Sequence, residues 1–223
     1  MADGKKEGQG DIYNFQYARD HEKEDPADYW EFKEILKLHK PLPQAEVLEI
    51  GCNTGEFCWL LEQKYEVIIR GVDINQEAIS RAKSKYPDMN FQLIDLFEVE
   101  GSYDVIYMQH VIEHLKNPKK ALKHIKNLLK DKGVFILSCP NQWAYILKLN
   151  CWIHGTRFCY DSTHLNEFNP QNLTNLLHKT GFKHIKYSTR PLGLPLLPCI
   201  SKKLYFSFSS GKFGGFIFMI AQK

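Results

Sequence analysis

The chain has 223 residues and a net charge of +3, from 29 Lys and Arg against 26 Asp and Glu. Its 43% hydrophobic and 25% charged residues are typical of a globular protein, and the length suits one domain with a full core. The mild positive balance argues against a nucleic-acid partner, whose binding domains carry a clustered basic face, and no apolar run reaches the ~18 residues that a transmembrane helix needs.

The N-terminal part of the chain is expected to contribute a tail and a helix. Residues 1–12 are rich in Gly and Lys and predict a disordered tail, because such a segment cannot bury apolar surface. Residues 13–45 are the predicted N-terminal helical segment. Within it, the apolar positions of residues 26–39 follow one helical stripe, with Pro26 in the first turn and Pro41 after the last.

From residue 46 onward, short apolar strands alternate with helical patterns. This alternation predicts a parallel sheet that is covered by helices on both faces. The expected strands are residues 46–50, 67–74, 91–95, 103–109, 133–139, 182–188 and 213–222, and the expected helices are residues 56–64, 76–85, 117–130 and 170–181.

Two stretches interrupt the alternation, at residues 140–168 and 191–211. Long irregular segments in a compact domain are usually functional. Each of these follows a strand of the second half of the sheet, so both predict caps over the edge at which the strands end. The second combines leucines with Lys202 and Lys203, which predicts either a lid on the pocket or a weak contact with a membrane surface.

The first strand runs directly into a glycine-containing turn and a helix, in the segment Val47–Phe57 (VLEIGCNTGEF). Gly51 and Gly55 allow the backbone to approach a ligand closely. Their Gly-x-x-x-Gly spacing differs from the Gly-x-Gly-x-x-Gly of dinucleotide-binding turns, because Asn53 and Glu56 occupy the other two glycine places. The spacing therefore argues against a nicotinamide-dependent oxidoreductase.

Acidic residues follow the next two strands. Asp73 is placed to accept two hydrogen bonds from a ribose diol. Asp95 is placed to accept one from the exocyclic amine of adenine. Either acid alone is equally well explained as a helix cap, but two acids at consecutive strand ends predict an adenosine site.

Five motifs between Glu46 and Asn141 resemble those of class I S-adenosylmethionine-dependent methyltransferases: VLEIGCNTGEF, GVDI, LIDLF, YDVIYMQHVIEHL and LLKDKGVFILSCPN. The resemblance implies a single α/β domain over residues 46–223, with a Rossmann-like, mostly parallel seven-stranded sheet whose last strand is antiparallel. It also implies an enzyme that uses S-adenosyl-L-methionine as cofactor and releases S-adenosyl-L-homocysteine.

The same resemblance implies the cofactor contacts. Gly51, Cys52 and Gly55 are expected to pass under the methionine portion, while Asp73 holds the ribose and Asp95 the adenine amine. We expect Cys52 to be a small residue that fits the turn rather than a nucleophile. The other expected contacts are Glu49, which organises the turn, Asn53 and Phe57 of the first motif, Ile74 and Leu96 beside the adenine, and Gln109 and His110 by the methionine tail and the transferring methyl group.

The candidate catalytic residues are His110, His114 and His164. A hydroxyl that accepts a methyl group must lose its proton, and His is the usual base near neutral pH. The string H-x-x-x-F-x-P-x-x-L that begins at His164 resembles O-methyltransferases of ubiquinone biosynthesis and of bacterial polysaccharide clusters. This second resemblance implies O-methylation of a small polar acceptor, such as a sugar or a phenol-like or quinone-like molecule.

Several alternatives stay open. His110, Glu113, His114 and His164 are potential metal ligands, because some ubiquinone-type and small-RNA 2′-O-methyltransferases resemble this pattern, with Glu where this chain has His110. We nevertheless expect a plain base and no metal. The alternative functions are RNA or protein methylation and nucleotide-dependent oxidoreduction. We expect a monomer or a homodimer, and the absence of a CxxC pair among the six cysteines predicts reduced thiols and a cytoplasmic location.

Overall fold

The structure is a computed structural model that describes residues 25–142, 163–191 and 214–223. The predicted tail at residues 1–12 lies outside the described residues. The same is true of residues 143–162 of the first predicted cap and of residues 192–211 of the second, so only the remaining residues of the two caps enter the description.

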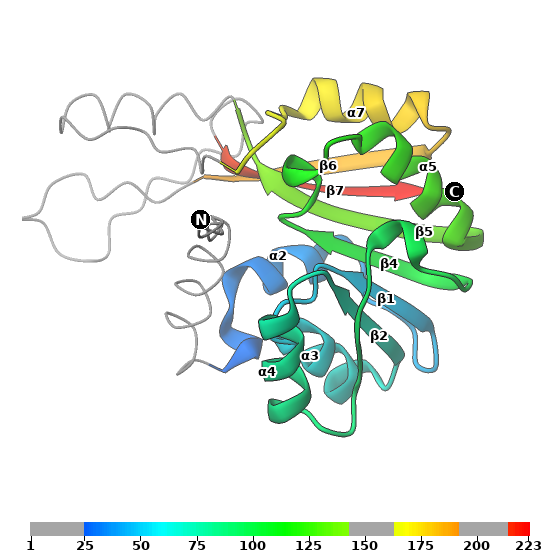
Figure 1. Cartoon of the computed structure of the whole chain (residues 1–223). Coiled ribbons are helices and arrows are strands. Elements are labelled where there is room, and N and C mark those ends of the chain that lie inside the picture. The colour runs from blue at the N-terminus through cyan, green and yellow to red at the C-terminus, as the bar shows by residue number, and fades with distance from the viewer. Residues whose placement is uncertain (1–24, 143–162, 192–213) are drawn as a thin grey trace, which may run out of the picture.

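The sheet has seven strands in the order β3-β2-β1-β4-β5-β7-β6 (Figure 1). Strand β7 is antiparallel to its neighbours β5 and β6, and the other neighbouring pairs are parallel. The predicted fold class is therefore confirmed. The strands are β1 (Glu46–Ile50), β2 (Ile68–Asp73), β3 (Asn90–Leu93), β4 (Tyr103–Gln109), β5 (Leu129–Pro140), β6 (Lys183–Pro191) and β7 (Gly214–Gln222).

Several helices begin at asparagine side chains that accept hydrogen bonds from the first backbone N–H groups. Asn75 caps α4 in this way and Asn117 caps α5, while Asn169 and Asn172 form a reciprocal capping box at α7. The helices are η1 (Pro26–Asp28), α2 (Trp30–Leu38), α3 (Glu56–Tyr65), α4 (Gln76–Lys85), η2 (Leu96–Glu98), η3 (Ile112–His114), α5 (Pro118–Leu128) and α7 (Pro170–Lys179), where η marks a 3-10 helix.

Four of the five predicted helices have different bounds in the structure, and two of these differences have a clear cause in the backbone. The helix expected at residues 26–39 is a 3-10 turn followed by α2, because Tyr29 between them has extended backbone angles (φ −61°, ψ 119°). The helix expected to reach residue 130 ends at Leu128, since Leu129 is extended and pairs with Tyr103 as the first residue of β5.

Apolar residues on the two faces of the sheet form two cores. Neighbouring side chains in a strand point to opposite faces, so on β1 Val47 belongs to the core with α2, α3 and α4, and Leu48 belongs to the core with α5 and α7 (Figure 1). Helix α2 contributes Phe32, Ile35 and Leu36. The predicted N-terminal segment therefore shares the core of the sheet.

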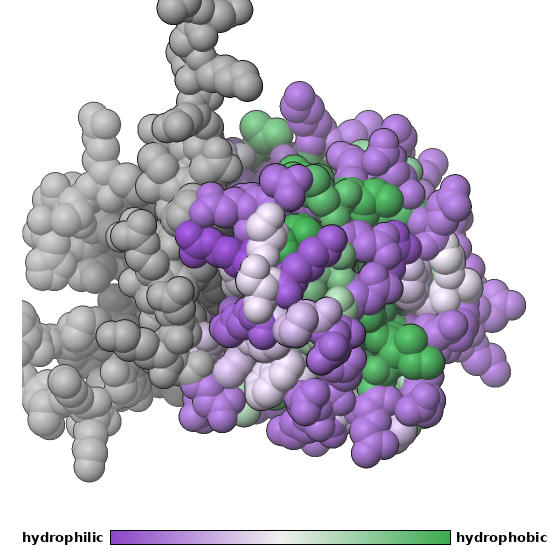
Figure 2. Space-filling model, turned by 60° about the horizontal axis from the view of Figure 1, so that its bottom comes forward, coloured by the Kyte–Doolittle hydropathy of each residue, from purple (hydrophilic) through white to green (hydrophobic). Residues whose placement is uncertain are grey.

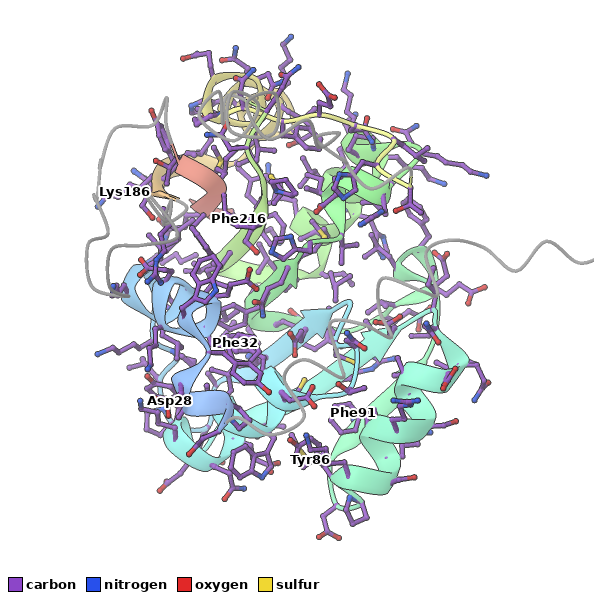
Figure 3. All side chains as sticks on the ribbon, turned by 90° about the vertical axis from the view of Figure 1, so that its left-hand side faces the viewer. Asp28, Phe32, Tyr86, Phe91, Lys186 and Phe216 are labelled. Carbon is purple, nitrogen blue, oxygen red and sulfur yellow. The ribbon has the colours of Figure 1, made fainter. Side chains whose placement is uncertain are left out.

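The parallel strands end at one edge of the sheet, called the carboxyl edge below. Strand β6 ends there and β7 begins there. Asn141 ties the start of β7 to the end of β5, because its backbone N–H donates to the carbonyl of Gly215 and its Nδ2 donates to that of Gly214, both at 2.8 Å. Figure 3 faces this edge, with Phe91 of β3 toward one end of the sheet and Phe216 of β7 toward the other.

The face of the described residues shown in Figure 2 is mainly hydrophilic. On the face shown in Figure 2, hydrophobic residues gather in small areas between hydrophilic ones. Leu42 and Ile74 are the most exposed large apolar side chains among the described residues, at 75% and 73%. Within the same residues, no helix has both the length and the apolar character needed to cross a membrane.

Candidate active site

The turn between β1 and α3 has a backbone that only glycine tolerates at two positions. Gly51 and Gly55 have φ of +77° and +86°, in the left-handed region. A Cβ at Gly51 would lie 2.3 Å from Cγ2 of Val111, and one at Gly55 would lie 2.4 Å from Cζ of Phe91. Both glycines are therefore required by the conformation and packing of the turn, in addition to any approach to a ligand.

Asp73, at the end of β2, fastens this turn to the sheet. Its Oδ2 accepts from the backbone N–H of Asn53 (3.0 Å) and its Oδ1 from that of Asn75 (2.8 Å). Burial raises the pKa of Asp73, and the backbone N–H groups oppose that rise. The next side chain, Ile74, is largely exposed, so an acid and an apolar surface lie together at the end of β2.

Asp95 follows β3 and caps η2. Its Oδ1 accepts from the backbone N–H of Phe97 at 2.8 Å, and the Asp95 side chain is exposed. Leu96 is 6% exposed and belongs to the core with α5 and α7, so its side chain packs inside the protein. Asp95 thus acts as the helix cap that was one of its two predicted roles. Its carboxylate can accept further hydrogen bonds in addition to this one.

Glu49 is a buried carboxyl group on β1. It accepts from Cys58 Sγ at 2.9 Å and from Gln109 Nε2 at 3.2 Å. Burial raises the pKa of Glu49 to about 8, the two hydrogen bonds oppose the rise, and the charges of Glu56 and Asp73 add to it. This group is therefore largely neutral at neutral pH unless a cation approaches.

Cys52 and Phe57 pack inside the protein. Cys52 is 4% exposed, and burial raises the pKa of its thiol well above the usual range, as expected for a small residue in a tight turn. The Phe57 ring is 2% exposed, with its centroid 4.7 Å from that of Phe32 and 5.1 Å from that of Tyr107. Its side chain thus joins α3 to α2.

His110 follows β4 in a strained conformation, with φ of +51° and its N–H donating to the carbonyl of Ser138 (3.0 Å). Its Nδ1 lies 3.4 Å from Oε1 of Glu113, and its Nε2 lies 3.5 Å from Oε1 of Glu31. Burial lowers the pKa of His110, but the two carboxylates outweigh it and raise the pKa to about 10. The ring is therefore held as a cation.

His114 and His164 come together beside Glu113. Their ring centroids are 4.8 Å apart, and Nδ1 of His114 lies 3.1 Å from Oγ1 and 3.3 Å from the carbonyl oxygen of Thr163. One ligand atom each from Glu113, His114 and His164 lies within 4.8 Å of the others. His114 and His164 thus form one cluster with Glu113, and His110, the third predicted catalytic histidine, contacts this cluster through Glu113.

Glu31 is the site residue that sequence reasoning missed. Glu31 is 8% exposed, although its helix also carries the exposed Lys33 and Lys37. The available signal was its position between two aromatic residues, Trp30 and Phe32. The helical pattern predicted α2 but did not indicate which strand end its buried face would meet.

A profile of the methyltransferase domain family matches residues 20–187. A probable S-adenosylmethionine-dependent methyltransferase of Mycobacterium tuberculosis is 26% identical over 164 residues, which cover 71% of this chain and 57% of that protein. A trans-aconitate 2-methyltransferase of Deinococcus radiodurans is 26% identical over 125 residues, covering 52% of this chain and 48% of that protein. The matched part spans about half the length of these curated relatives.

A solved structure of a SAM-dependent methyltransferase from Archaeoglobus fulgidus has the same fold. It superposes with a TM-score of 0.69 at 20% identity, and the alignment covers 95% of this chain and 100% of that chain. At this level of identity the likeness establishes the arrangement of strands and helices.

Proposed function

Because the chain belongs to the methyltransferase domain family, we propose that it transfers the methyl group of S-adenosylmethionine to a hydroxyl of a small polar acceptor. One observation carries this proposal. The turn after β1, Asp73 after β2 and His110 after β4 lie on adjoining parallel strands at the carboxyl edge. In open α/β sheets, ligands bind outside this edge.

In this proposal, the adenosine lies over the ends of β2 and β3. Asp73 accepts from the ribose with the lone-pair sites that its two backbone bonds leave. The exposed Ile74 side chain supports the adenine, and Asp95 accepts from the adenine amine with its remaining capacity. The buried Leu96 contributes through its backbone.

The methionine portion is assigned to the turn and to the end of β4. Gly51, Cys52, Asn53 and Gly55 supply backbone beneath it. Glu49 is a buried acid whose two hydrogen bonds come from a thiol and an amide. A positively charged α-amino group would favour its ionised form, so we assign Glu49 to that group.

The cofactor supplies an electrophilic methyl group, and the protein supplies alignment and proton removal. We assign the proton of His114 to Nδ1, because the carbonyl oxygen of Thr163 can only accept and its hydroxyl can also accept, and this tautomer keeps Nε2 as a base. We assign proton removal to His114 or His164. His110 has a carboxylate beside each ring nitrogen, which favours N–H on both, so we assign it to orientation of the acceptor.

A metal-assisted form of this transfer is the second candidate. Glu113 is 2% exposed, and neither of its carboxylate oxygens has a hydrogen-bond partner among the described residues. Together with His114 and His164 it offers two imidazoles and one carboxylate, which suit zinc, iron or manganese better than magnesium. A metal there would lower the pKa of the acceptor hydroxyl in place of a histidine base.

Calorimetric titration with S-adenosylmethionine, S-adenosylhomocysteine and NAD tests the cofactor. We expect binding of the first two and none of NAD, and the reverse would refute the proposal. Mass spectrometry after incubation with a sugar, a catechol, trans-aconitate and a short RNA then identifies the acceptor class. Activity that is lost with a chelator and restored by a divalent ion would select the metal-assisted form.

Two further expectations stay predictions. The oligomeric state, monomer or homodimer, is measured by light scattering. The cytoplasmic location is consistent with the free thiols of Cys52, Cys58 and Cys139, since reduced cysteines are usual in that compartment.

A further inference from the structure

We propose that Glu31, on the N-terminal helix α2, is a positioning residue of the transfer site. It holds the His110 imidazole through the ring nitrogen that Glu113 does not contact. The inference rests on the proposed function in one respect, namely that His110 lies beside the acceptor. The contact between Glu31 and His110 is independent of that assignment.

The burial of Glu31 calls for a cationic partner. Removing a carboxylate from water is costly unless a charge or hydrogen bonds compensate it. Two other acidic residues close by pair with exposed lysines, Asp28 of η1 with Lys33 and Glu34 of α2 with Lys37. Glu31 instead points inward, to Nε2 of His110 at 3.5 Å.

The His110 ring lies between two carboxylates that come from different parts of the chain. Glu113 lies 3.4 Å from Nδ1 and Glu31 lies 3.5 Å from Nε2. Both separations exceed the ~2.7–3.2 Å of a settled hydrogen bond, and both lie within the ~4 Å reach of an ion pair. The edge of the ring meets Phe216, with the centroids 5.5 Å apart and the planes at 83°. The ring is thus restrained on three sides.

Helix α2 is anchored so that Glu31 reaches this position. The Trp30 ring lies 5.4 Å from that of Phe216, and the Arg190 guanidinium lies 4.6 Å from the centre of the Trp30 ring. Arg190 also pairs with Glu34 at 3.1 Å. Figure 3 shows Phe32 of α2 and Phe216 of β7 on the same side of the carboxyl edge. These contacts fix α2 against β6 and β7.

The left-handed backbone of His110 indicates why a second carboxylate is needed. A non-glycine residue in this region is strained and persists only where its surroundings over-determine its conformation. Glu113 lies three residues along the chain and belongs to the same turn, so it moves with His110. Glu31 belongs to α2, so it restrains the ring relative to an element that does not move with the turn.

Nitrogen NMR of the histidine side chains tests the contact directly. The probe is protein with 15N-labelled histidine, saturated with S-adenosylhomocysteine, and the His110 signals are assigned by their loss in His110→Gln. We expect Glu31→Gln to shift the Nε2 resonance of His110. The matched control is Asp28→Asn, in the neighbouring turn η1, which should leave that resonance in place while it breaks the exposed pair with Lys33.

An unchanged Nε2 resonance in Glu31→Gln would overturn the inference, as would an equal shift in Asp28→Asn. If Glu31→Gln does not fold, Glu31→Asp keeps the charge, withdraws the carboxylate by one methylene and serves the same comparison. These outcomes do not depend on turnover, so they are distinguishable from a failure of the proposed function.

Kinetics with an acceptor that the wild-type protein methylates then separate positioning from folding. We expect Glu31→Gln to lower kcat about 10-fold or more, because misplacement of a group near the reacting atoms is costly, while S-adenosylhomocysteine affinity is retained. Glu31→Asp should recover part of the loss. A merely structural role would instead lower cofactor affinity and thermal stability together, and that result would contradict the inference.

Discussion

The two halves of the carboxyl edge hold their acidic groups in different ways. In the first half, formed by the ends of β1, β2 and β3, Asp73 and Asp95 accept from backbone N–H groups. In the second half, beyond β4, Glu31 and Glu113 face the imidazole of His110. The carboxylates of the first half are held by backbone N–H groups, which every residue except proline carries. Those of the second half contact a side chain, and Glu31 and Glu113 come from separate segments of the chain.

This difference determines how each half responds to change. A carboxylate held by backbone N–H groups keeps its place as long as the strand and the following turn form. A carboxylate that faces an imidazole depends on the packing of α2, η3 and the residues around His164 against one another. Substitutions in the second half should therefore affect turnover, and those in the first half should affect cofactor affinity.

The largest expected effect is on turnover in His164→Ala. Loss of a general base should lower kcat roughly 100-fold or more, while S-adenosylhomocysteine binding measured by calorimetry survives. His178→Ala, on the exposed side of α7, is the control. Normal turnover in both His164→Ala and His114→Ala would show that the second half contributes no base.

The next largest effect is expected for Asp73→Ala in the first half. Loss of a charged hydrogen-bond partner costs roughly 1.5–3 kcal/mol, so affinity for S-adenosylhomocysteine should fall at least about tenfold. Release of the Asn53 turn acts in the same direction. Asp104→Ala, at the other end of the sheet, should bind normally. If Asp73→Ala bound S-adenosylhomocysteine with the affinity of the wild-type protein, the proposal that Asp73 holds the ribose would be wrong.

Glu49 predicts a pH dependence of stability that opposes that of ordinary acids. Its pKa is about 8 in the fold against 4.5 when solvated, so between these values the folded protein binds the extra proton. The contribution of Glu49 is complete below pH 4.5 and is lost as the pH rises toward 8, by up to ~1.4 kcal/mol per pH unit. Denaturant unfolding of the ligand-free protein should show this slope, and Glu49→Gln should lack it. Identical slopes would contradict the prediction.

The smallest expected effects concern Asp95. Alanine removes both the η2 cap, worth about 1 kcal/mol, and the proposed adenine contact, whereas Asp95→Asn keeps the cap. Thermal unfolding should therefore detect a loss in Asp95→Ala but not in Asp95→Asn, and calorimetry should detect a modest loss of affinity in both. Full affinity in Asp95→Asn would leave Asp95 with the capping role alone.

Much of the first half was predictable from the sequence because its interactions are local. The order of strand, turn and helix around Gly51 and Gly55 follows from apolar runs and from two glycines whose left-handed φ restricts the residue type. Asp73 and Asp95 were predicted at strand ends, where parallel strands bring successive residues to one edge. The alternation of strands and helices predicted a parallel sheet covered on both faces, and the resemblance to class I methyltransferases implied its antiparallel last strand.

The sequence by itself determined the strands, their alternation with helices and the adjoining acids, since each depends on residues close together in the chain. The tertiary structure decided that Phe57 and Leu96 point into the core, that α2 brings Glu31 to His110, and that His114 meets His164. Such contacts depend on which face of each element is buried and on how elements pack. Periodicity indicates that a face is apolar but does not indicate what covers it.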